Sequence, residues 1–312
     1  MTTKIIRSLS RWQQPCVVTI GSFDGVHLGH QQLLLTLQAE GKQRGLPTVI
    51  VTFEPQPAEF LFAGSKCLAR LTRFREKFKA LAALQPDYVL VLRFNAELAA
   101  LTAEDFITKI LSQGLQAKHI LVGDDFRFGH ARMGDFTLLK QAGEKQGFTV
   151  AAMPTFTLTG ERVSSTRVRK ALAEGNQELA ARLLGRPYTM EGRVVRGDQR
   201  GRQLGFPTAN VRVQRTTTPL QGVYAVRAHL PKGECVNGVA NLGMRPTVNG
   251  VRTLLEVHLL DFNQDIYGQS IQVEFCHKLR EEQRFSSLDE LKIYIAKDVE
   301  AARDYHALCI EK

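Results

Sequence analysis

The sequence contains no apolar run long enough to cross a membrane. Its longest apolar stretches have the length of a strand, far short of the ~20 residues that a membrane helix needs, and its first residues lack the apolar core of a signal peptide. It also has no internal repeat, no low-complexity segment and no sign of disorder. We therefore expect a globular protein of the cytoplasm without a membrane partner.

Cysteine is scarce, and its spacing fits neither a disulfide framework nor a metal site. The chain has no Cys-x-x-Cys pair, and its five cysteines are spread over Cys16, Cys67, Cys235, Cys276 and Cys309. Three of them lie in apolar runs. We expect buried free thiols of a reducing compartment.

Acidic residues are outnumbered by basic ones, and the net charge is +10 at neutral pH. Such a charge favours an anionic partner, either a nucleic acid or a phosphate-rich small molecule. The basic residues are not interleaved with aromatic residues, and no motif that reads nucleic acid occurs. Their local concentrations, Arg162 to Lys170 and Arg193 to Arg202, suit phosphate-bearing substrates, so we expect no nucleic-acid partner.

The chain of 312 residues is long for one compact core, which favours two domains. Strand-like runs alternate with helical segments up to residue 185, as is typical of a parallel sheet covered by helices. Beyond Gly185-Arg186-Pro187, short strand-like runs are separated by Gly, Pro and Asn, which is typical of a small antiparallel barrel. We predict an α/β domain at 1–185 and a β-barrel domain with a C-terminal helix at 186–312.

Hydrophobic periodicity gives the expected bounds of the elements. In the first domain we predict strands at Cys16 to Gly21, Thr48 to Phe53, Tyr88 to Phe94 and His119 to Gly123, and helices at Gln31 to Arg44, Arg73 to Leu84, Glu104 to Leu115, Phe136 to Gln146 and Lys170 to Glu174. In the second domain we predict strands at Met190 to Val195, Gly222 to Leu230, Val236 to Asn241, Leu254 to Leu260 and Ile271 to Cys276, and a helix at Leu291 to Leu308 behind a capping box of Ser287 and Glu290.

Residues 21 to 30 read Gly-Ser-Phe-Asp-Gly-Val-His-Leu-Gly-His and connect a predicted strand to a predicted helix. Glycines let the backbone approach a phosphate closely, and a helix start offers free N–H groups to an anion. Two imidazoles at this place, His27 and His30, can donate hydrogen bonds to charge that develops during phosphate transfer. The segment therefore indicates a phosphate-binding loop.

Two other interpretations of this histidine pair are weaker. A zinc site needs three or four ligands, and no Cys or His cluster stands nearby in the sequence. Surface histidines beside a tight turn would be the default for an isolated pair, but the strand before, the helix after and the surrounding glycines favour phosphate binding.

The stretch from Arg162 to Arg169 places three hydroxyl residues between arginines. Helix capping accounts for one hydroxyl residue, but not for three with flanking arginines. A triphosphate that releases pyrophosphate needs many hydrogen-bond donors and compensating positive charge, and arginine supplies both. We interpret the stretch as a second phosphate-binding segment.

Two features of the second domain suit phosphate chemistry. The Gly- and Arg-rich stretch from Gly197 to Asn210 can wrap phosphates, and its Thr208 and Asn210 offer the hard oxygen ligands that Mg²⁺ prefers, although a plain surface loop would have the same composition. Alternation places Glu256 and His258 on one face of a strand, facing inward among apolar neighbours, where a carboxylate is costly unless it has a function such as accepting a hydroxyl proton. On a solvated face, Glu256 would be an ordinary surface residue.

The His-x-Gly-His spacing resembles the signature of the nucleotidylyltransferase superfamily, and the Phe-Asp-Gly-Val before it narrows the resemblance to bacterial flavin adenylyltransferases. The Ser-Ser-Thr-x-x-Arg stretch resembles a second motif of that family, and Phe53-Glu54-Pro55-Gln56-Pro57 and the segment from Gly123 to Gly129 match it more weakly. The resemblance implies that His27 and His30 are catalytic. It also implies an ATP phosphate site made of Gly21, Phe23, Asp24, Gly25, Gly29, Asp125, Arg162, Ser164, Ser165, Thr166 and Arg169.

The stretch that ends in Pro-Thr-Ala-Asn resembles the signature of riboflavin kinases. This resemblance implies that Glu256 is the catalytic base and that Thr208 and Asn210 bind Mg²⁺. It implies further ATP and flavin contacts at Gly197, Gly201, Arg202, Gly205, Pro207, Asn241 and Arg280.

Both resemblances together cover nearly the whole chain, in the order found in bifunctional bacterial riboflavin kinase/FAD synthetases. They imply that riboflavin is phosphorylated by ATP to FMN, that FMN is adenylylated by a second ATP to FAD, and that pyrophosphate leaves. Two other classes stay open: a synthetase-like enzyme acting with tRNA, which should carry a Lys-Met-Ser-Lys-Ser-type loop that the sequence lacks, and a flavin- or nucleic-acid-binding protein without catalysis.

Overall fold

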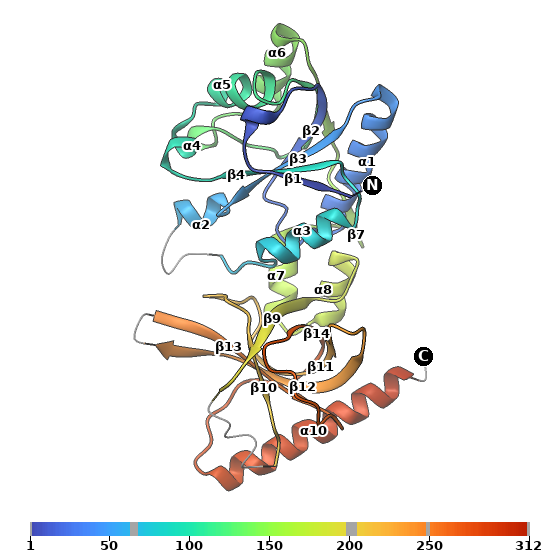
Figure 1. Cartoon of the computed structure of the whole chain (residues 1–312), viewed down its shortest axis with the longest axis vertical. Coiled ribbons are helices and arrows are strands. Elements are labelled where there is room, and N and C mark those ends of the chain that lie inside the picture. Colours follow the sequence, from blue (N-terminus) through green and yellow to red (C-terminus); the bar gives the residue numbers. More distant parts are fainter. Residues whose placement is uncertain (1, 63–67, 198–204, 248–249, 311–312) are drawn as a thin grey trace. The chain divides into compact units, whose positions relative to one another are not determined.

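A computed structural model describes residues 2–62, 68–197, 205–247 and 250–310, and the chain divides into two compact units (Figure 1). The first unit comprises Met1–Leu68 and Arg73–Ser164, and the second comprises Ala69–Thr72 and Ser165–Lys312. The division that we expect between functional halves, at residue 186, stays a prediction. No helix among the described residues is long and apolar enough to span a membrane.

The first unit is a six-stranded parallel sheet with helices on both faces, which confirms the predicted α/β class. Its strands run in the order β1-β4-β3-β2-β5-β6. The bounds are β1 (Lys4–Ile6), η1 (Leu9–Arg11), β2 (Cys16–Ile20), α1 (Leu28–Arg44), β3 (Thr48–Glu54), α2 (Pro57–Leu61), α3 (Phe74–Ala82), β4 (Tyr88–Arg93), α4 (Ala96–Ala100), α5 (Ala103–Asp105), the π-helical η2 (Phe106–Ser112), β5 (Ala117–Gly123), η3 (His130–Arg132), α6 (Phe136–Gln146), β6 (Thr149–Met153), β7 (Thr157–Leu158) and β8 (Glu161–Arg162).

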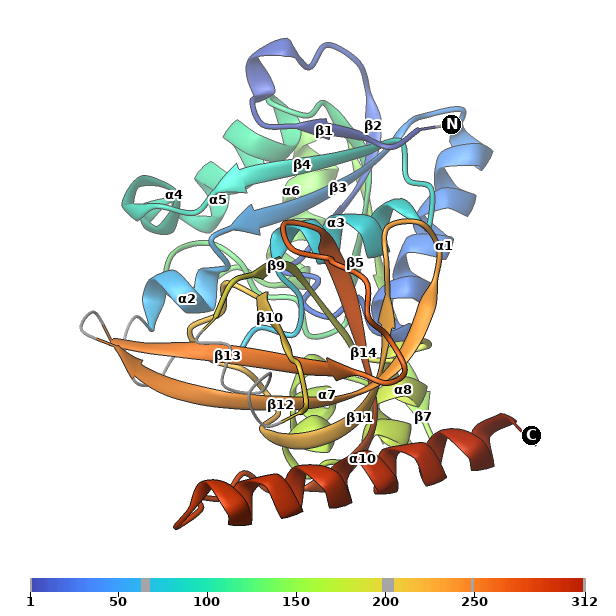
Figure 2. The ribbon, with the colours of Figure 1, turned by 60° about the horizontal axis from the view of Figure 1, so that its bottom comes forward.

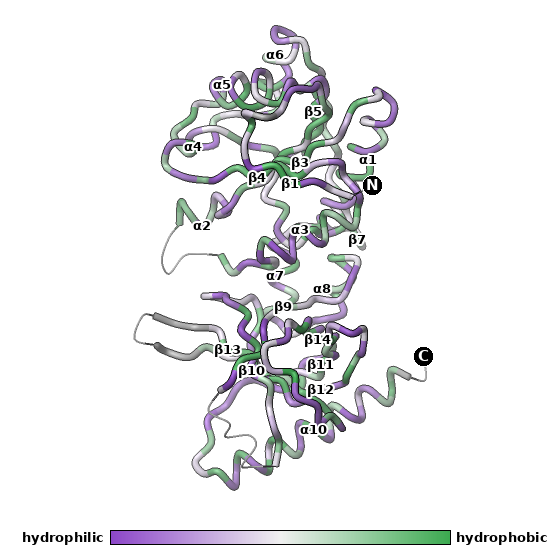
Figure 3. Tube along the Cα trace, in the orientation of Figure 1, coloured by the Kyte–Doolittle hydropathy of each residue, from purple (hydrophilic) through white to green (hydrophobic). Residues whose placement is uncertain are grey.

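Successive side chains of these strands enter two different cores. Val18 of β2 packs with Ile107 of η2 and Leu139 of α6, whereas Val17 packs on the opposite face with Leu34 of α1 and Leu81 of α3. Because both faces of the sheet are covered, the strands are apolar without alternation. Figure 3 shows this as hydrophobic colour along β3 and β5.

The second unit is a closed antiparallel barrel with strand order β10-β13-β12-β11-β14-β9, which confirms the predicted barrel. A long C-terminal helix crosses its outer surface (Figure 2). The bounds are α7 (Ser165–Ala173), α8 (Gln177–Leu184), β9 (Thr189–Val195), β10 (Ala209–Arg212), β11 (Gly222–His229), β12 (Cys235–Thr247), β13 (Gly250–Leu259), β14 (Ser270–Arg280) and α10 (Leu288–Ile310).

Helix α10 packs against the outer surface of the barrel through a small apolar cluster. Ala302, Val299 and Tyr305 of α10 contact the cluster that contains Val223 and Val239 of the barrel. Ser287 caps the helix as predicted, accepting the Glu290 N–H at 3.1 Å. The reciprocal half of the box differs, because the Glu290 carboxylate accepts from the N–H and hydroxyl of Ser286 instead.

Four residues that precede α3 belong to the barrel unit, and we call Ala69–Thr72 the strap. The buried Arg215 donates to the carbonyl oxygens of Arg70 at 2.7 Å and Leu71 at 3.3 Å. The hydroxyl of Tyr188 donates to the same carbonyl oxygen of Leu71 at 3.1 Å. Leu71 itself is fully buried. The strap is therefore an internal part of the second unit despite its early place in the sequence.

The structure also corrects the predicted start of one helix and the predicted burial of the cysteines. The helix expected from Lys170 begins earlier, at Ser165, so the predicted phosphate-binding hydroxyls of Ser165 and Thr166 lie inside α7. Cys235, the first residue of β12, is exposed, while Cys16 is buried and Cys276 and Cys309 are half-buried. These four cysteines are free, and Cys67 lies outside the described residues.

Candidate functional site

The turn with the two histidines lies where the strand order of the sheet reverses. β2 pairs with β3 on one side and β5 on the other, so the chain winds outward in both directions from this point. In open α/β sheets, ligands bind beyond the carboxyl ends of the strands at such a switch point. The residues that follow β2 and those that follow β5 meet at this edge.

The turn from Gly21 to Val26 has a tightly specified backbone. Phe23, Gly25 and Val26 have positive φ values of 48°, 82° and 45°, which are uncommon for the two residues with side chains. A Cβ atom at Gly21 would lie 3.1 Å from the Phe23 ring. Asp24 is buried at 3 % exposure. The predicted phosphate loop therefore has one compact, fully packed conformation.

His27 and His30 lie together at the start of α1. His27 is its N-cap, with Nδ1 accepting the backbone N–H of His30 at 3.3 Å, and the two imidazole rings stack with centroids 3.6 Å apart. Burial, followed by the charges of His27 and Lys77, holds the pKa of His30 well below its ordinary value. His30 is therefore neutral near pH 7, and its ring can present one N–H donor.

A buried lysine beneath the turn is a feature that the sequence reasoning missed. Lys77 of α3 is fully buried, and its Nζ donates to the carbonyl oxygen of Ser22 at 2.9 Å and to Thr52 Oγ1 at 3.3 Å. Its sequence signal was its place between Phe74 and Leu81 on the apolar face of the helix, at spacings where a hydrophobic residue is expected.

The residues after β5 are anchored to the segments that follow β6. Asp124 accepts from the N–H and the hydroxyl of Thr155 at 2.9 and 2.7 Å, and the bond from the Thr155 hydroxyl is the main cause that lowers the pKa of Asp124. Asp125 forms an ion pair with Arg162, both largely exposed. Such a surface pair contributes little stability, so the Arg162 guanidinium can leave Asp125 for another anion at little cost.

Residues of the stretch from Arg162 to Arg169 contact different parts of the structure. Val163 donates its N–H to the carbonyl of Phe156, whose side chain lies against Gly29 of α1. Arg169 lies on α7, where its Nε donates to the Ala69 carbonyl of the strap at 2.7 Å.

Three predicted kinase residues form a row across adjacent barrel strands. Glu256 of β13 is directly opposite Asn210 of β10 and Asn241 of β12, so the three side chains share one face. All three are half-buried, and Asn241 Oδ1 has no hydrogen-bond partner among the described residues. We call Asn210, Glu256 and Asn241 the polar row.

The expectation that Glu256 faces inward among apolar neighbours is wrong. Leu255 and Val257 are fully buried in the barrel interior, whereas Glu256 and His258 share the outward face, as the alternation predicted. Glu256 is therefore not inside the apolar core, and its half-buried position leaves it accessible to a substrate.

Two contacts shape the loops around the polar row. A Cβ atom at Gly197 would overlap the Asn210 amide, so the glycine makes room for that side chain. His258 Nδ1 lies 2.8 Å from the Pro207 carbonyl oxygen, which places Thr208 next to the strand of Glu256. Gly205, with a φ of 88°, is exposed, and the predicted contacts Gly201 and Arg202 lie outside the described residues.

Arg280, which we predicted to contact a ligand, forms several contacts with other residues of the second unit. Asp298 of α10 accepts from its Nε and Nη2 at 2.8 and 2.7 Å, and the guanidinium lies over the rings of Phe285 and Tyr294. Arg280 thus fixes α10 and the segment before it. That segment places the Glu282 carboxylate against Gly243, two residues from Asn241.

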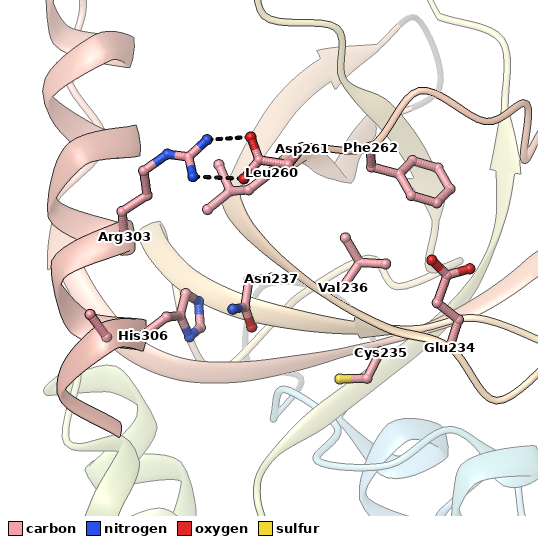
Figure 4. Close-up of a pocket in the computed structure, with 10 residues that line it drawn as sticks. Glu234, Cys235, Val236, Asn237, Leu260, Asp261, Phe262, Arg303 and His306 are labelled. Carbon is pink, nitrogen blue, oxygen red and sulfur yellow. Dashed lines mark hydrogen bonds and ion pairs between the residues drawn. The ribbon is translucent and has the colours of Figure 1, made fainter. Parts of the chain in front are cut away.

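The barrel also has a cavity of about 420 Å³ beside α10 (Figure 4). Figure 4 shows Asp261 and Arg303 paired at its edge and His306 directed toward Asn237. The two bonds between Arg303 and Asp261 are each 2.7 Å long. Burial lowers the pKa of His306. No residue of either predicted site lines this cavity.

No group of three or more His, Cys, Asp or Glu side chains that could hold a metal ion occurs among the described residues.

The comparisons with known proteins cover both units. Residues 9–167 match the family model described as FAD synthetase, and residues 184–306 match that described as riboflavin kinase. A bifunctional riboflavin kinase/FMN adenylyltransferase of Escherichia coli strain K12 is 54% identical over 95% of this chain and 94% of its own length. One of Haemophilus influenzae is 47% identical over 97% and 99%. A crystal structure described as a macrolide-efflux protein from Streptococcus pneumoniae has a TM-score of 0.82 and 31% identity, covering 97% of this chain and 99% of that one.

Proposed function

The chain belongs to the bifunctional riboflavin kinases/FMN adenylyltransferases, and we propose that residues 1–185 carry the adenylyl transfer and residues 186–312 the kinase reaction. The enzyme uses ATP to convert riboflavin to FMN and then FMN to FAD. Its ligands are thus riboflavin, FMN, FAD and ATP. The cytoplasmic location and the lack of a nucleic-acid partner stay predictions.

The polar row is the observation that carries the kinase assignment. Glu256 is the base that accepts the proton of the riboflavin hydroxyl as its oxygen attacks the γ-phosphate of ATP, and ADP leaves. The carboxylate lies between two amides on one accessible face, where the hydroxyl can reach it. Positioning and charge stabilisation supply most of the rate enhancement in such transfers.

The same face suits a magnesium ion. The row offers hard oxygen donors, and Asn241 Oδ1, which has no hydrogen-bond partner among the described residues, supports this proposal. Thr208 and Asn210 would hold the ion, which would neutralise charge on the ATP phosphates. Gly197, Gly205 and Pro207 shape the loop that holds the nucleotide, as would Gly201 and Arg202. The contacts of Arg280 favour a role in positioning over direct flavin contact.

The stacked histidines at the start of α1 carry the adenylyltransferase assignment. The FMN phosphate attacks the α-phosphate of ATP, and the bond to the departing pyrophosphate breaks without a covalent enzyme intermediate. His27 and His30 donate hydrogen bonds to the charge that develops, supported by the N–H groups of the helix start. Gly21, Phe23, Asp24, Gly25 and Gly29 maintain the loop. Asp125, Arg162, Ser164, Ser165, Thr166 and Arg169 complete the phosphate site in this proposal.

Product analysis tests the whole assignment. The protein is incubated with riboflavin, ATP and Mg²⁺, and the flavins are separated by chromatography. We expect FMN first and FAD later, and FAD alone when FMN replaces riboflavin. A protein that only retains flavin without converting it would contradict both assignments and support the non-catalytic alternative.

Replacing Gly197 by alanine is expected to weaken the kinase step without unfolding the barrel. The added Cβ overlaps only the end of the Asn210 side chain, so the amide must turn away from the polar row while the backbone stays in place. We expect the KM for ATP in FMN formation to rise about tenfold. Lys232→Ala, at an exposed position in a turn of the same barrel, is the control. Equal effects of both substitutions would contradict the role of Asn210.

A further inference from the structure

The side chain of Lys77 buries its ammonium group in the interior of the first unit. It has no exposed surface, although burying an ammonium is costly unless it is well paired and hydrogen-bonded. An apolar side chain of similar length would fill this place on the apolar face of α3 without that cost. The charged end therefore needs an explanation beyond packing.

The ammonium is directed at the backbone of the phosphate loop. It donates to the carbonyl oxygen of Ser22 at 2.9 Å, and the Thr52 hydroxyl, itself fully buried on β3, lies 3.3 Å from Lys77 Nζ and 3.4 Å from the same carbonyl. Lys77 and Thr52 thus hold one carbonyl from two different elements. This carbonyl lies between Gly21 and Phe23, where the backbone enters its positive-φ conformation.

We propose that Lys77 is a positioning residue for adenylyl transfer, which fixes the Ser22 carbonyl and with it the turn that carries His27 and His30. The inference rests on the proposed placement of that reaction at these histidines. When the carbonyl is held inward, the peptide plane is fixed, and the following N–H groups keep their direction toward the phosphates. A fixed positive charge beneath the loop also favours the anionic substrate.

The lysine acts on the reaction without touching the reacting atoms. A displacement of about 1 Å in a catalytic group can cost roughly 10²-fold in rate, and the histidines follow the clamped turn directly in sequence. The effect should therefore fall on kcat of FAD formation, while the KM for FMN stays within about twofold because no FMN contact is lost.

Lys77→Met tests the proposal in the full-length protein, with FAD formation from FMN as the assay. We expect kcat to fall by about 10²-fold. Lys79→Met, an exposed lysine on the same helix, is the matched control and should keep normal FAD formation. FMN formation from riboflavin, measured in the same preparations, should be unchanged. A parallel loss of both activities would overturn the proposal, because it would indicate a general structural role.

Thr52→Val provides a second, milder test if Lys77→Met does not fold. It removes one hydrogen-bond partner of the clamp and should slow FAD formation by roughly three- to tenfold. Where both variants fold, the double variant should be no slower than Lys77→Met, since both residues hold one carbonyl. Normal FAD formation in Thr52→Val, or additive losses, would contradict the clamp.

His30→Ala separates failure of this inference from failure of the site. Impaired His30→Ala with normal Lys77→Met would refute the clamp and leave the site in place. Normal FAD formation in both would show that the proposed adenylyl site itself is wrong.

Discussion

Glu256→Gln is expected to slow the conversion of riboflavin to FMN by roughly 10²–10⁴-fold, measured as kcat with both substrates saturating. Glutamine keeps the size and shape of the side chain and can still pack between Asn210 and Asn241, but it cannot accept the hydroxyl proton. Binding of riboflavin and ATP should therefore be retained while the chemical step is lost.

Conversion of FMN to FAD by the same variant is the internal control for folding, because it uses none of the residues of the polar row. Two results would count against Glu256 as the base: normal FMN production by the variant, or a loss that is repaired by raising riboflavin. The second result would place the carboxylate in substrate binding instead of proton transfer.

His30→Ala should lower FAD formation by about 10²–10³-fold and leave FMN formation nearly intact, since removing a donor aimed at transition-state charge has an effect of this size. His27→Ala should act in the same direction and also weaken the start of α1, because His27 Nδ1 accepts the His30 N–H there. The assay is FAD formation from supplied FMN, followed by chromatography.

His130→Ala offers a matched control for these variants. This histidine is also in the first unit, at the exposed 3₁₀ turn η3, and belongs to neither proposed site. It should retain FAD formation. Unchanged adenylyl transfer in both His27→Ala and His30→Ala would refute the phosphate-loop interpretation.

Much of the fold followed from the sequence because local patterns and tertiary structure agree. The predicted helix from Phe136 to Gln146 has the bounds of α6, where Asp135 caps the first turn and Gly147 ends the last in the left-handed conformation. The β12 strand, by contrast, continues past the predicted end at Asn241 as far as Thr247, although Pro246 would argue against a strand. Pairing with β13 from Gly238 to Thr247 maintains it.

The sites were only partly predictable for a similar reason. Motifs named Asn210, Asn241 and Glu256 one by one, and only the pairing of β13 with β10 and β12 brings the three onto one face. Motifs do not identify buried residues that hold a loop in place. Lys77 belongs to no motif, and although its place on the apolar face of α3 is unusual for a lysine, its contact with Ser22 depends on how α3 packs under a turn 55 positions away. The bonds from Arg280 to Asp298 likewise depend on where α10 lies.

The strap makes the kinase barrel a discontinuous fold. A fragment cut at Arg186 would contain the whole polar row but would leave Tyr188 and Arg215 without the carbonyl acceptors of Leu71 and its neighbour. Each buried donor that loses its acceptor costs about 1–3 kcal/mol, and the space of the Leu71 side chain would be empty as well. Transplanting the barrel into another protein therefore requires two pieces of chain, and a short peptide that contains the strap sequence should bind to and stabilise a barrel produced without it.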